Sequence, residues 1–202
     1  NTKKNLNKIF ILLKNYVFNL RKSNISLPEI TQLKLNSNSI FCRMEYKGKN
    51  LFMLGLNEKN FLNFKDYFNQ IIEIILTAKK QKINIDPHLK NFVVDENKIY
   101  YVDIFPPYSN DLKKIRQNYY INSSEKKIVN SNFEFFKPKN LFYHFVSDLI
   151  KINPKFESRI NYIYKILKKK KVINSDKNNF NKIVKKILHT EKLREKKNLY
   201  LI

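Results

Sequence analysis

Four polar residues in the middle of the chain have the types and spacing that phosphoryl transfer requires. Asp86, His88 and Asn91 follow one another as Asp-x-His-x-x-Asn, and Asp103 comes after a further apolar stretch. Transfer of a phosphoryl group from a nucleotide uses one carboxylate to orient or deprotonate the acceptor hydroxyl. It uses an amide oxygen and a second carboxylate to hold Mg²⁺. The sequence therefore predicts Asp86 as a catalytic residue and Asn91 and Asp103 as metal ligands.

The stretch between Asn91 and Asp103 has the pattern of a strand, a turn and a returning strand. Residues 92–94 are apolar, residues 95–97 have turn composition, and residues 99–102 are again mostly apolar. Short apolar runs bounded by turn residues are typical of buried strands. Each polar residue also has an ordinary structural interpretation. Asp86 precedes a proline, as many turn aspartates do. Asn91 could cap a loop, and Asp103 could simply end an edge strand.

The order of these residues resembles the catalytic loop and metal-binding strand of the aminoglycoside phosphotransferase and choline kinase group, within the protein-kinase-like superfamily. That group commonly reads His-Gly-Asp-x-His-x-x-Asn, followed by two strands and an Asp. Residues 27–30 (LPEI) resemble the group's entry into a strand, and residues 41–51 (FCRMEYKGKNL) resemble its hinge. Apolar residues recur at helical spacing between hinge and loop: Phe64, Tyr67, Phe68, Ile71, Ile72 and Ile75. The resemblance covers roughly residues 25–107.

The resemblance implies an α+β fold with two lobes. Residues 1–56 would be a reduced β-containing N-terminal lobe ending at the hinge, and residues 57–202 a mostly helical catalytic lobe. It implies ATP or GTP with Mg²⁺ as cofactors, and a hinge at Glu45 and Tyr46 that binds the adenine edge through its backbone. It further implies that His88 braces the catalytic loop and that Lys90 lies near the transferred phosphate.

Several departures from the group's pattern motivate an alternative function. Asn84 and Ile85 stand where the group has His-Gly, and Pro106 and Pro107 follow the metal-binding strand. The sequence has no glycine-rich hairpin of the kind that covers the nucleotide phosphates in this group. It also has no strand lysine in such a setting, and the first predicted helix has no acidic residue to pair with one. We therefore expect the first strands of the small lobe to be missing. A catalytically inactive module that binds a nucleotide or a protein partner is the main alternative.

The formal net charge of +23 suggests anionic partners. However, Lys is abundant together with Asn, Ile, Phe and Tyr, which all share AT-rich codons, so genomic base bias also explains the charge. The lysines are scattered and the aromatic residues lie at core-like spacing, which disfavours nucleic-acid binding as the main role. A basic atypical kinase associated with RNA is a second alternative. The acceptor hydroxyl is expected on a small molecule or glycan, and an anionic acceptor is favoured. The protein could also act at the surface of a membrane.

The remaining composition indicates a folded globular protein, with 43% hydrophobic and 14% aromatic residues. No apolar run approaches the roughly 20 residues of a membrane span, and no signal peptide is visible. The single Cys42 excludes an internal disulfide and suits a reducing cytosol, so a cytoplasmic location is expected. The oligomeric state has no signature in the sequence.

Apolar spacing predicts further helices on either side of the loop. One opens the chain around residues 6–17, and a short one spans 111–119. Residues 142–152 are predicted to be helical up to Pro154, and two amphipathic helices close the chain around residues 160–167 and 180–188. Strands are predicted at 31–35 and 39–46. Asp176 or Ser175 is expected to cap the last helix, whereas His144 and His189 are interpreted as structural or exposed.

Overall fold

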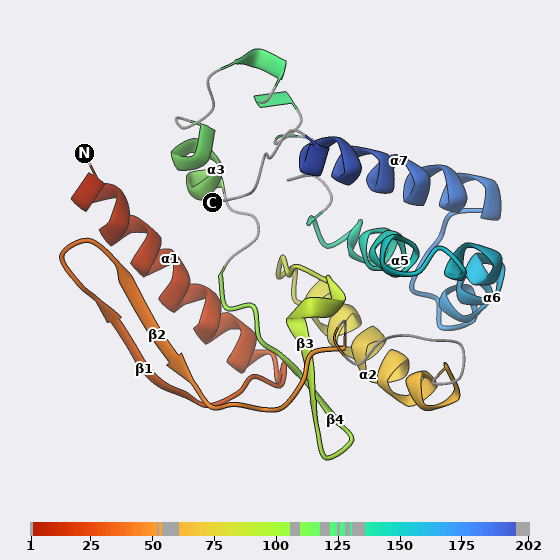
Figure 1. Ribbon diagram of the computed structural model, residues 1–202, viewed down its shortest axis with the longest axis horizontal. Helices are drawn as coiled ribbons and strands as arrows, with labels where there is room; N and C mark the ends of the chain where they lie inside the picture. The colour runs from red at the N-terminus through yellow and green to blue at the C-terminus, as the bar shows by residue number, and fades with distance from the viewer. Residues whose placement is uncertain are drawn as a thin grey trace.

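The computed structural model describes residues 2–51, 53, 61–105, 110–117, 122–124, 126–127, 130 and 136–196. The fold is mixed α+β, with long helices and two separate antiparallel hairpins (Figure 1). The elements, in chain order, are α1 (Thr2–Lys22), β1 (Ile30–Leu35), β2 (Ile40–Met44), α2 (Phe61–Lys80), a 3₁₀ turn (Leu89–Asn91), β3 (Phe92–Asp95), β4 (Lys98–Tyr101), α3 (Asn110–Gln117), α5 (Leu141–Ile152), α6 (Phe156–Lys169) and α7 (Lys177–Lys196).

The first hairpin, β1–β2, lies along α1 (Figure 1). Leu13 and Val17 lie one helical turn apart on α1 and are almost fully buried. They form a small apolar cluster with Ile104, against which the partly buried side chains of the hairpin pack, including Leu33 and Cys42. Because Ile104 follows β4, this cluster joins the hairpin and α1 to the segment that carries Asp103.

The second hairpin, β3–β4, is closed by a tight turn and braced by α2. Its register pairs Asp95 with Lys98, so Glu96 and Asn97 form the turn, both with positive φ. Two central residues with positive φ characterise the type I′ turn, whose twist suits a two-residue hairpin. The side chain of Gln70 in α2 donates to the carbonyl oxygen of Asn97 at 2.7 Å and accepts from a β4 amide at 2.9 Å. This brace fixes β4 against α2.

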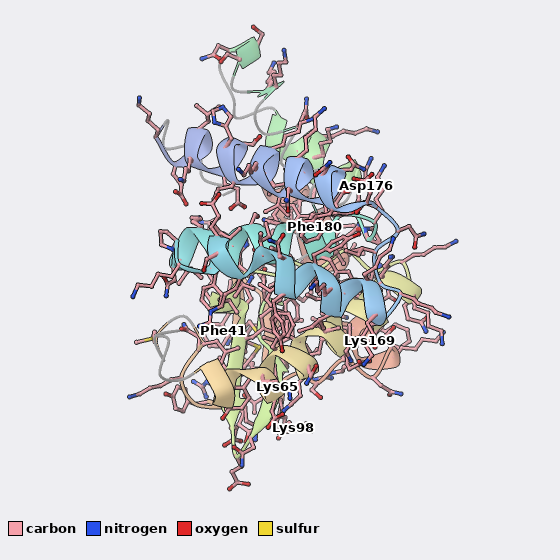
Figure 2. The ribbon with its side chains drawn as sticks, turned by 90° about the vertical axis from the view of Figure 1, so that its right-hand side faces the viewer. Phe41, Lys65, Lys98, Lys169, Asp176 and Phe180 are labelled. Atoms are coloured by element: carbon pink, nitrogen blue, oxygen red, sulfur yellow. The ribbon has the colours of Figure 1, made fainter. Side chains whose placement is uncertain are left out.

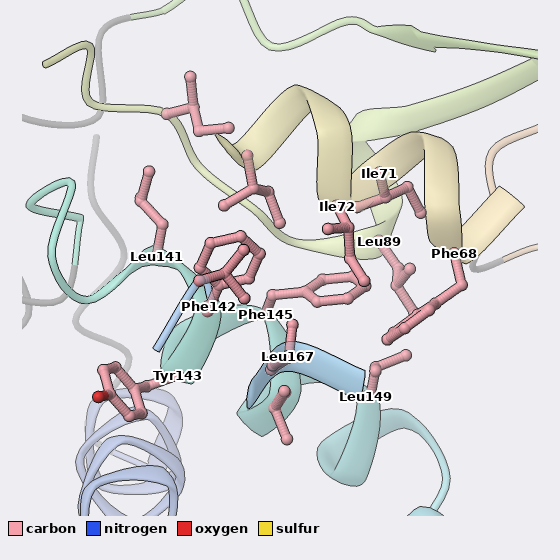
Figure 3. Close-up of a cluster of buried hydrophobic side chains, with 14 of the residues drawn as sticks. Phe68, Ile71, Ile72, Leu89, Leu141, Phe142, Tyr143, Phe145, Leu149 and Leu167 are labelled. Atoms are coloured by element: carbon pink, nitrogen blue, oxygen red, sulfur yellow. The ribbon is translucent and has the colours of Figure 1, made fainter. Parts of the chain in front are cut away.

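The main core lies between α2 and the C-terminal helices α5, α6 and α7 (Figure 3). Every residue from Leu141 to Ile150 in α5 is buried, as expected of a helix enclosed on all sides. Phe68 and Phe145 pack with ring centroids 5.7 Å apart. Leu89, from the loop before β3, points into the same cluster, so the core positions that loop directly (Figure 3).

The helices and strands predicted from apolar spacing are present in the structure. The helix before the loop spans Phe61–Lys80, and the short helix expected at 111–119 is observed as α3. Asp176 lies at the start of α7 (Figure 2) and caps this helix, since its carboxylate accepts the Asn179 N–H at 2.9 Å. The mixed α+β class is thereby confirmed. Parts of the segment 51–56, and Pro106 with Pro107, lie outside the described residues.

None of the described helices combines the length and the apolar character that crossing a membrane requires.

Candidate functional site

The loop from Asp86 to Asn91 is a compact turn anchored on both sides. Asp86 precedes a proline, which disfavours helical backbone at that position. Its Oδ1 accepts the backbone N–H of His88 at 3.2 Å, closing a local turn. The 3₁₀ turn then places Leu89 in the core, fully buried, while its N–H donates to Asp148 Oδ2 at 2.8 Å. The loop is therefore tied to α5 by an apolar side chain and a charged hydrogen bond.

Asp86 and His88 form a buried ion pair through Asp86 Oδ1 and His88 Nδ1. Burial raises the pKa of Asp86, but the charge and hydrogen bond of His88 outweigh burial and hold that pKa well below its usual range. Burial lowers the pKa of His88, whereas Asp86, followed by Glu191 and Asp148, raises it well above that of a free imidazole. Asp86 is thus an ionised carboxylate over the whole physiological pH range.

Asn91 joins the loop to the strand that precedes Asp103. Its side-chain amide donates to the carbonyl oxygen of Asp86 at 3.1 Å, and its own carbonyl accepts the N–H of Val102 at 2.9 Å. Asp103 Oδ1 accepts the N–H of Phe105 at 3.0 Å. Burial, followed by the negative charge of Asp86, raises the pKa of Asp103 to about 7 against the opposing effects of Phe105 and nearby cations. The two carboxylates of the motif are therefore electrostatically coupled.

Lys90 is the exposed cation of the loop. Its side chain lies at the surface, and its charge lowers the pKa of Asp103 against the larger effects of burial and Asp86.

Beneath the loop, the backbone N–H of Asp86 donates to the hydroxyl oxygen of Tyr101 at 2.8 Å, and Tyr101 is fully buried. Burial also raises the pKa of Tyr16 on α1, with Asp103 contributing. Two buried tyrosines thus line the inner side of the loop.

A second group of polar side chains is buried on the other side of His88. His88 Nε2 lies 3.1 Å from Glu191 Oε1, and His144 Nε2 lies 2.6 Å from the same oxygen. His144 and Glu191 are fully buried. Burial raises the pKa of Glu191, but His144 and then His88 outweigh it and hold that pKa far below its usual range. Lys151 Nζ lies 3.8 Å from Glu191 Oε2. We call His88, His144 and Glu191 the His–Glu cluster.

The hinge-like segment lies at the surface between β2 and β3. Tyr46 is 79% exposed, and Glu45 forms an ion pair with Lys47. Gly48 has φ +92°, and a Cβ at this position would lie 2.4 Å from the carbonyl oxygen of Val94. Only glycine therefore allows the segment to run against β3 as it does. A hinge role for Glu45 and Tyr46 would rest on their backbone groups.

In the structure Asp86, His88 and Asn91 are joined by hydrogen bonds, and Asp103 and Lys90 are coupled to them electrostatically. The two hinge residues, Glu45 and Tyr46, are exposed at the surface. Sequence reasoning missed Tyr101, Asp148 and Glu191. It also interpreted His144 as structural or exposed, and the structure shows it buried against His88. One signal was available: His144, Ser147 and Asp148 lie at helical spacing within an otherwise apolar helix.

Comparison with known proteins gives no further guidance, because no family model, curated protein or solved structure matches the chain.

The oxygen donors and the His–Glu cluster offer two different chemistries. Asn91 and Asp103 present amide and carboxylate oxygens, the donors that Mg²⁺ prefers. The His–Glu cluster presents two imidazole nitrogens and one carboxylate, which suit Zn²⁺ or a similar transition metal. Asp86 lies between the two groups because it contacts both His88 and Asn91.

Proposed function

We propose that the protein transfers the γ-phosphoryl group of Mg-ATP or Mg-GTP to a hydroxyl group, on a protein-kinase-like fold with a small N-terminal lobe (1–56) and a helical lobe (57–202). The principal observation is that Asn91 hydrogen-bonds both to the backbone of Asp86 and to the N–H of Val102, which joins the segments that carry Asp86 and Asp103. The charge of Asp86 contributes to the raised pKa of Asp103. Like charges buried together favour the binding of a cation between or beside them.

The residues present fit Mg²⁺. Burial and then the charge of Asp86 raise the pKa of Asp103, and a bound cation would favour its ionised form. Asn91 and Asp103 would hold the ion, which would neutralise charge on the β- and γ-phosphates. Lys90, exposed beside them, adds a mobile positive charge for the transferred phosphoryl group.

Asp86 would orient the acceptor hydroxyl. Its Oδ1 is occupied by two bonds from His88, and no described residue donates to its Oδ2. The acceptor oxygen forms a bond to the γ-phosphorus as the bond to the β–γ bridging oxygen breaks, and the hydroxyl proton passes through Asp86 to solvent. The low pKa of Asp86 makes it a weak base, which suits a loose transition state in which the proton leaves late.

A small molecule or glycan is favoured as acceptor over a protein. The sequence after Asp103 has no Ala-Pro-Glu element of the kind that accompanies peptide docking in protein kinases. The net charge of +23 favours an anionic acceptor through long-range attraction. Sugars, amino alcohols and phosphorylated glycans are therefore the compounds to screen.

Calorimetric titration of ATP and GTP, with and without Mg²⁺, tests the proposal. The wild-type chain is compared with Asp103→Asn, and with Asp95→Asn as the matched control. Asp95 lies at the hairpin turn and pairs with the surface residue Lys47. We expect metal-dependent binding that Asp103→Asn abolishes and Asp95→Asn retains. Equal binding by both variants, or none by the wild type, would refute the Mg-nucleotide site.

A nucleotide-binding module without catalysis is the second candidate, because Asn84 and Ile85 replace the usual His-Gly. It predicts the same calorimetric result but no acceptor-dependent consumption of nucleotide across the screen. Transfer of label from γ-³²P nucleotide to any hydroxyl compound, lost in Asp86→Asn, would exclude it.

A further inference from the structure

We propose that the His–Glu cluster is a binding site for one Zn²⁺ ion, or a chemically similar transition-metal ion, separate from the Mg²⁺ ligands of the proposed reaction. The three ligand atoms are His88 Nε2, His144 Nε2 and a carboxylate oxygen of Glu191, and all lie within 4.8 Å of one another. They come from the loop, α5 and α7, so the ion would join three parts of the chain that are distant in sequence.

The donor set selects the class of metal. Two imidazole nitrogens and one carboxylate are a common set for Zn²⁺, whereas Mg²⁺ and Ca²⁺ prefer oxygen donors alone. The present spacings of 2.6 Å and 3.1 Å between nitrogen and oxygen are those of hydrogen bonds. Metal–ligand bonds of about 2.1 Å in a tetrahedron separate the ligands by roughly 3.4 Å. Each of these two nitrogen–oxygen spacings would therefore lengthen by less than about 1 Å when the ion binds.

The neighbours of the cluster match those of known metal-binding histidines. A metal-bound imidazole usually donates its other N–H to a carboxylate, which fixes the ring and its tautomer. His88 has this arrangement, since its Nδ1 faces Asp86 while its Nε2 faces Glu191. Asp148 Oδ1 lies 3.8 Å from the same Nε2 and would supply a fourth ligand after a small shift. Four protein ligands would make the site a structural one.

Charge and hydrogen bonding give an independent reason for a cation here. The carboxylates of Asp86, Asp148 and Glu191 all lie within 4 Å of the His88 ring nitrogens, and the ammonium of Lys151 lies 3.8 Å from Glu191 Oε2. Lys151 is also shared with Glu195 at the surface. The second oxygen of Glu191 is buried and accepts no hydrogen bond from the described residues. A divalent cation bound by Glu191 and the two imidazoles would also pair with the neighbouring carboxylates.

The test measures metal content and metal-dependent stability in the untagged full chain. After treatment with EDTA and dialysis, the protein is titrated with ZnSO₄ and its bound zinc is counted by mass spectrometry. The midpoint of thermal unfolding is recorded in parallel. We expect one equivalent of zinc per chain and a midpoint that rises until that equivalent is bound. Titration with Co²⁺ should give the visible absorption of a four-coordinate cobalt site.

Two variants locate the site. Glu191→Gln keeps a hydrogen-bond acceptor for both histidines but removes the charged ligand, whereas His189→Gln removes an exposed histidine two residues away on α7. The zinc equivalent and the cobalt spectrum should be lost in Glu191→Gln and retained in His189→Gln. Less than about 0.1 equivalent of zinc in the wild type, or equal loss in both variants, would overturn the proposal. The wild-type stoichiometry and cobalt spectrum decide the question even where a variant does not fold.

Discussion

Replacing Tyr101 by phenylalanine is expected to destabilise the protein by removing the acceptor that holds the backbone of Asp86. Tyr101 is fully buried, and the Asp86 N–H donates to its hydroxyl oxygen at 2.8 Å. Its ring packs against Phe92 with centroids 5.6 Å apart. Phenylalanine keeps this packing, so the change removes only the buried hydroxyl beneath the loop, which also faces Tyr16.

The size of the stability loss follows from the Asp86 N–H, which the substitution leaves buried without an acceptor. A buried donor without a partner costs about 1–3 kcal/mol, and no large cavity adds to this because the volume is nearly conserved. We therefore expect Tyr101→Phe to lower the free energy of unfolding by about 2 kcal/mol. In a chain of this size, that loss corresponds to a fall in the thermal midpoint of roughly 4–8 °C.

Urea unfolding followed by circular dichroism measures this difference. The midpoint should fall while the slope with urea stays unchanged, since the folded and unfolded surfaces are the same. Tyr100→Phe is the control, because Tyr100 is half-buried and its ring keeps its contact with Lys98 Nζ, 5.0 Å away, in the variant. The control should change stability by less than about 0.5 kcal/mol. Indistinguishable midpoints for the two variants would show that the Asp86–Tyr101 hydrogen bond does not hold the loop.

Three further predictions concern the elements around the site. Gly48→Ala should destabilise the protein by more than about 1 kcal/mol, because φ is positive and the new Cβ would clash with the Val94 carbonyl; an unchanged urea midpoint would contradict this. Leu89→Ala should cost about 3 kcal/mol through the cavity left in the core, and a loss below about 1 kcal/mol would mean that the loop is not anchored there. The pKa of Asp176 is lowered, chiefly by the N–H of Asn179, so its contribution to α7 is present above about pH 4 and lost as pH falls through that lowered pKa. Thermal unfolding of Asp176→Ala should therefore differ from the wild type at pH 7 and approach it at pH 3, whereas a constant difference would exclude the charged cap.

The parts of the fold that could be predicted are those encoded by local patterns. Apolar residues repeating every three or four positions located α2 and the C-terminal helices, because each helix buries one face. The hairpin β3–β4 was predicted from two apolar runs around turn residues, and the observed turn at Glu96 and Asn97 lies between them. The loop residues Asp86, His88 and Asn91 are close in space because they are close in sequence. Each of these predictions depends on residues that lie only a few positions apart in the sequence.

The polar contacts that surround the loop could not be predicted in the same way. Glu191 lies 103 positions from His88, and Asp148 lies 59 positions from Leu89. Nothing local distinguishes Glu191 from the other charged residues of a lysine-rich helix. Only the packing of α7 on α5 buries it and brings it to His88. His144 was visible as a polar residue in an apolar helix, but its partner was not.

The cost of this arrangement indicates that the loop is held in one conformation for a purpose. A connection between α2 and β3 requires no charged groups in the core, and each buried charge loses several kcal/mol of hydration unless it is well paired. Here the loop is bonded to β4 through Tyr101, to α5 through Asp148 and to α7 through Glu191. Groups with perturbed pKa values that converge on one turn are characteristic of functional sites. The same bonds fix the backbone on which Asp86 and Asn91 stand, which is the rigidity that the proposed phosphotransfer would require.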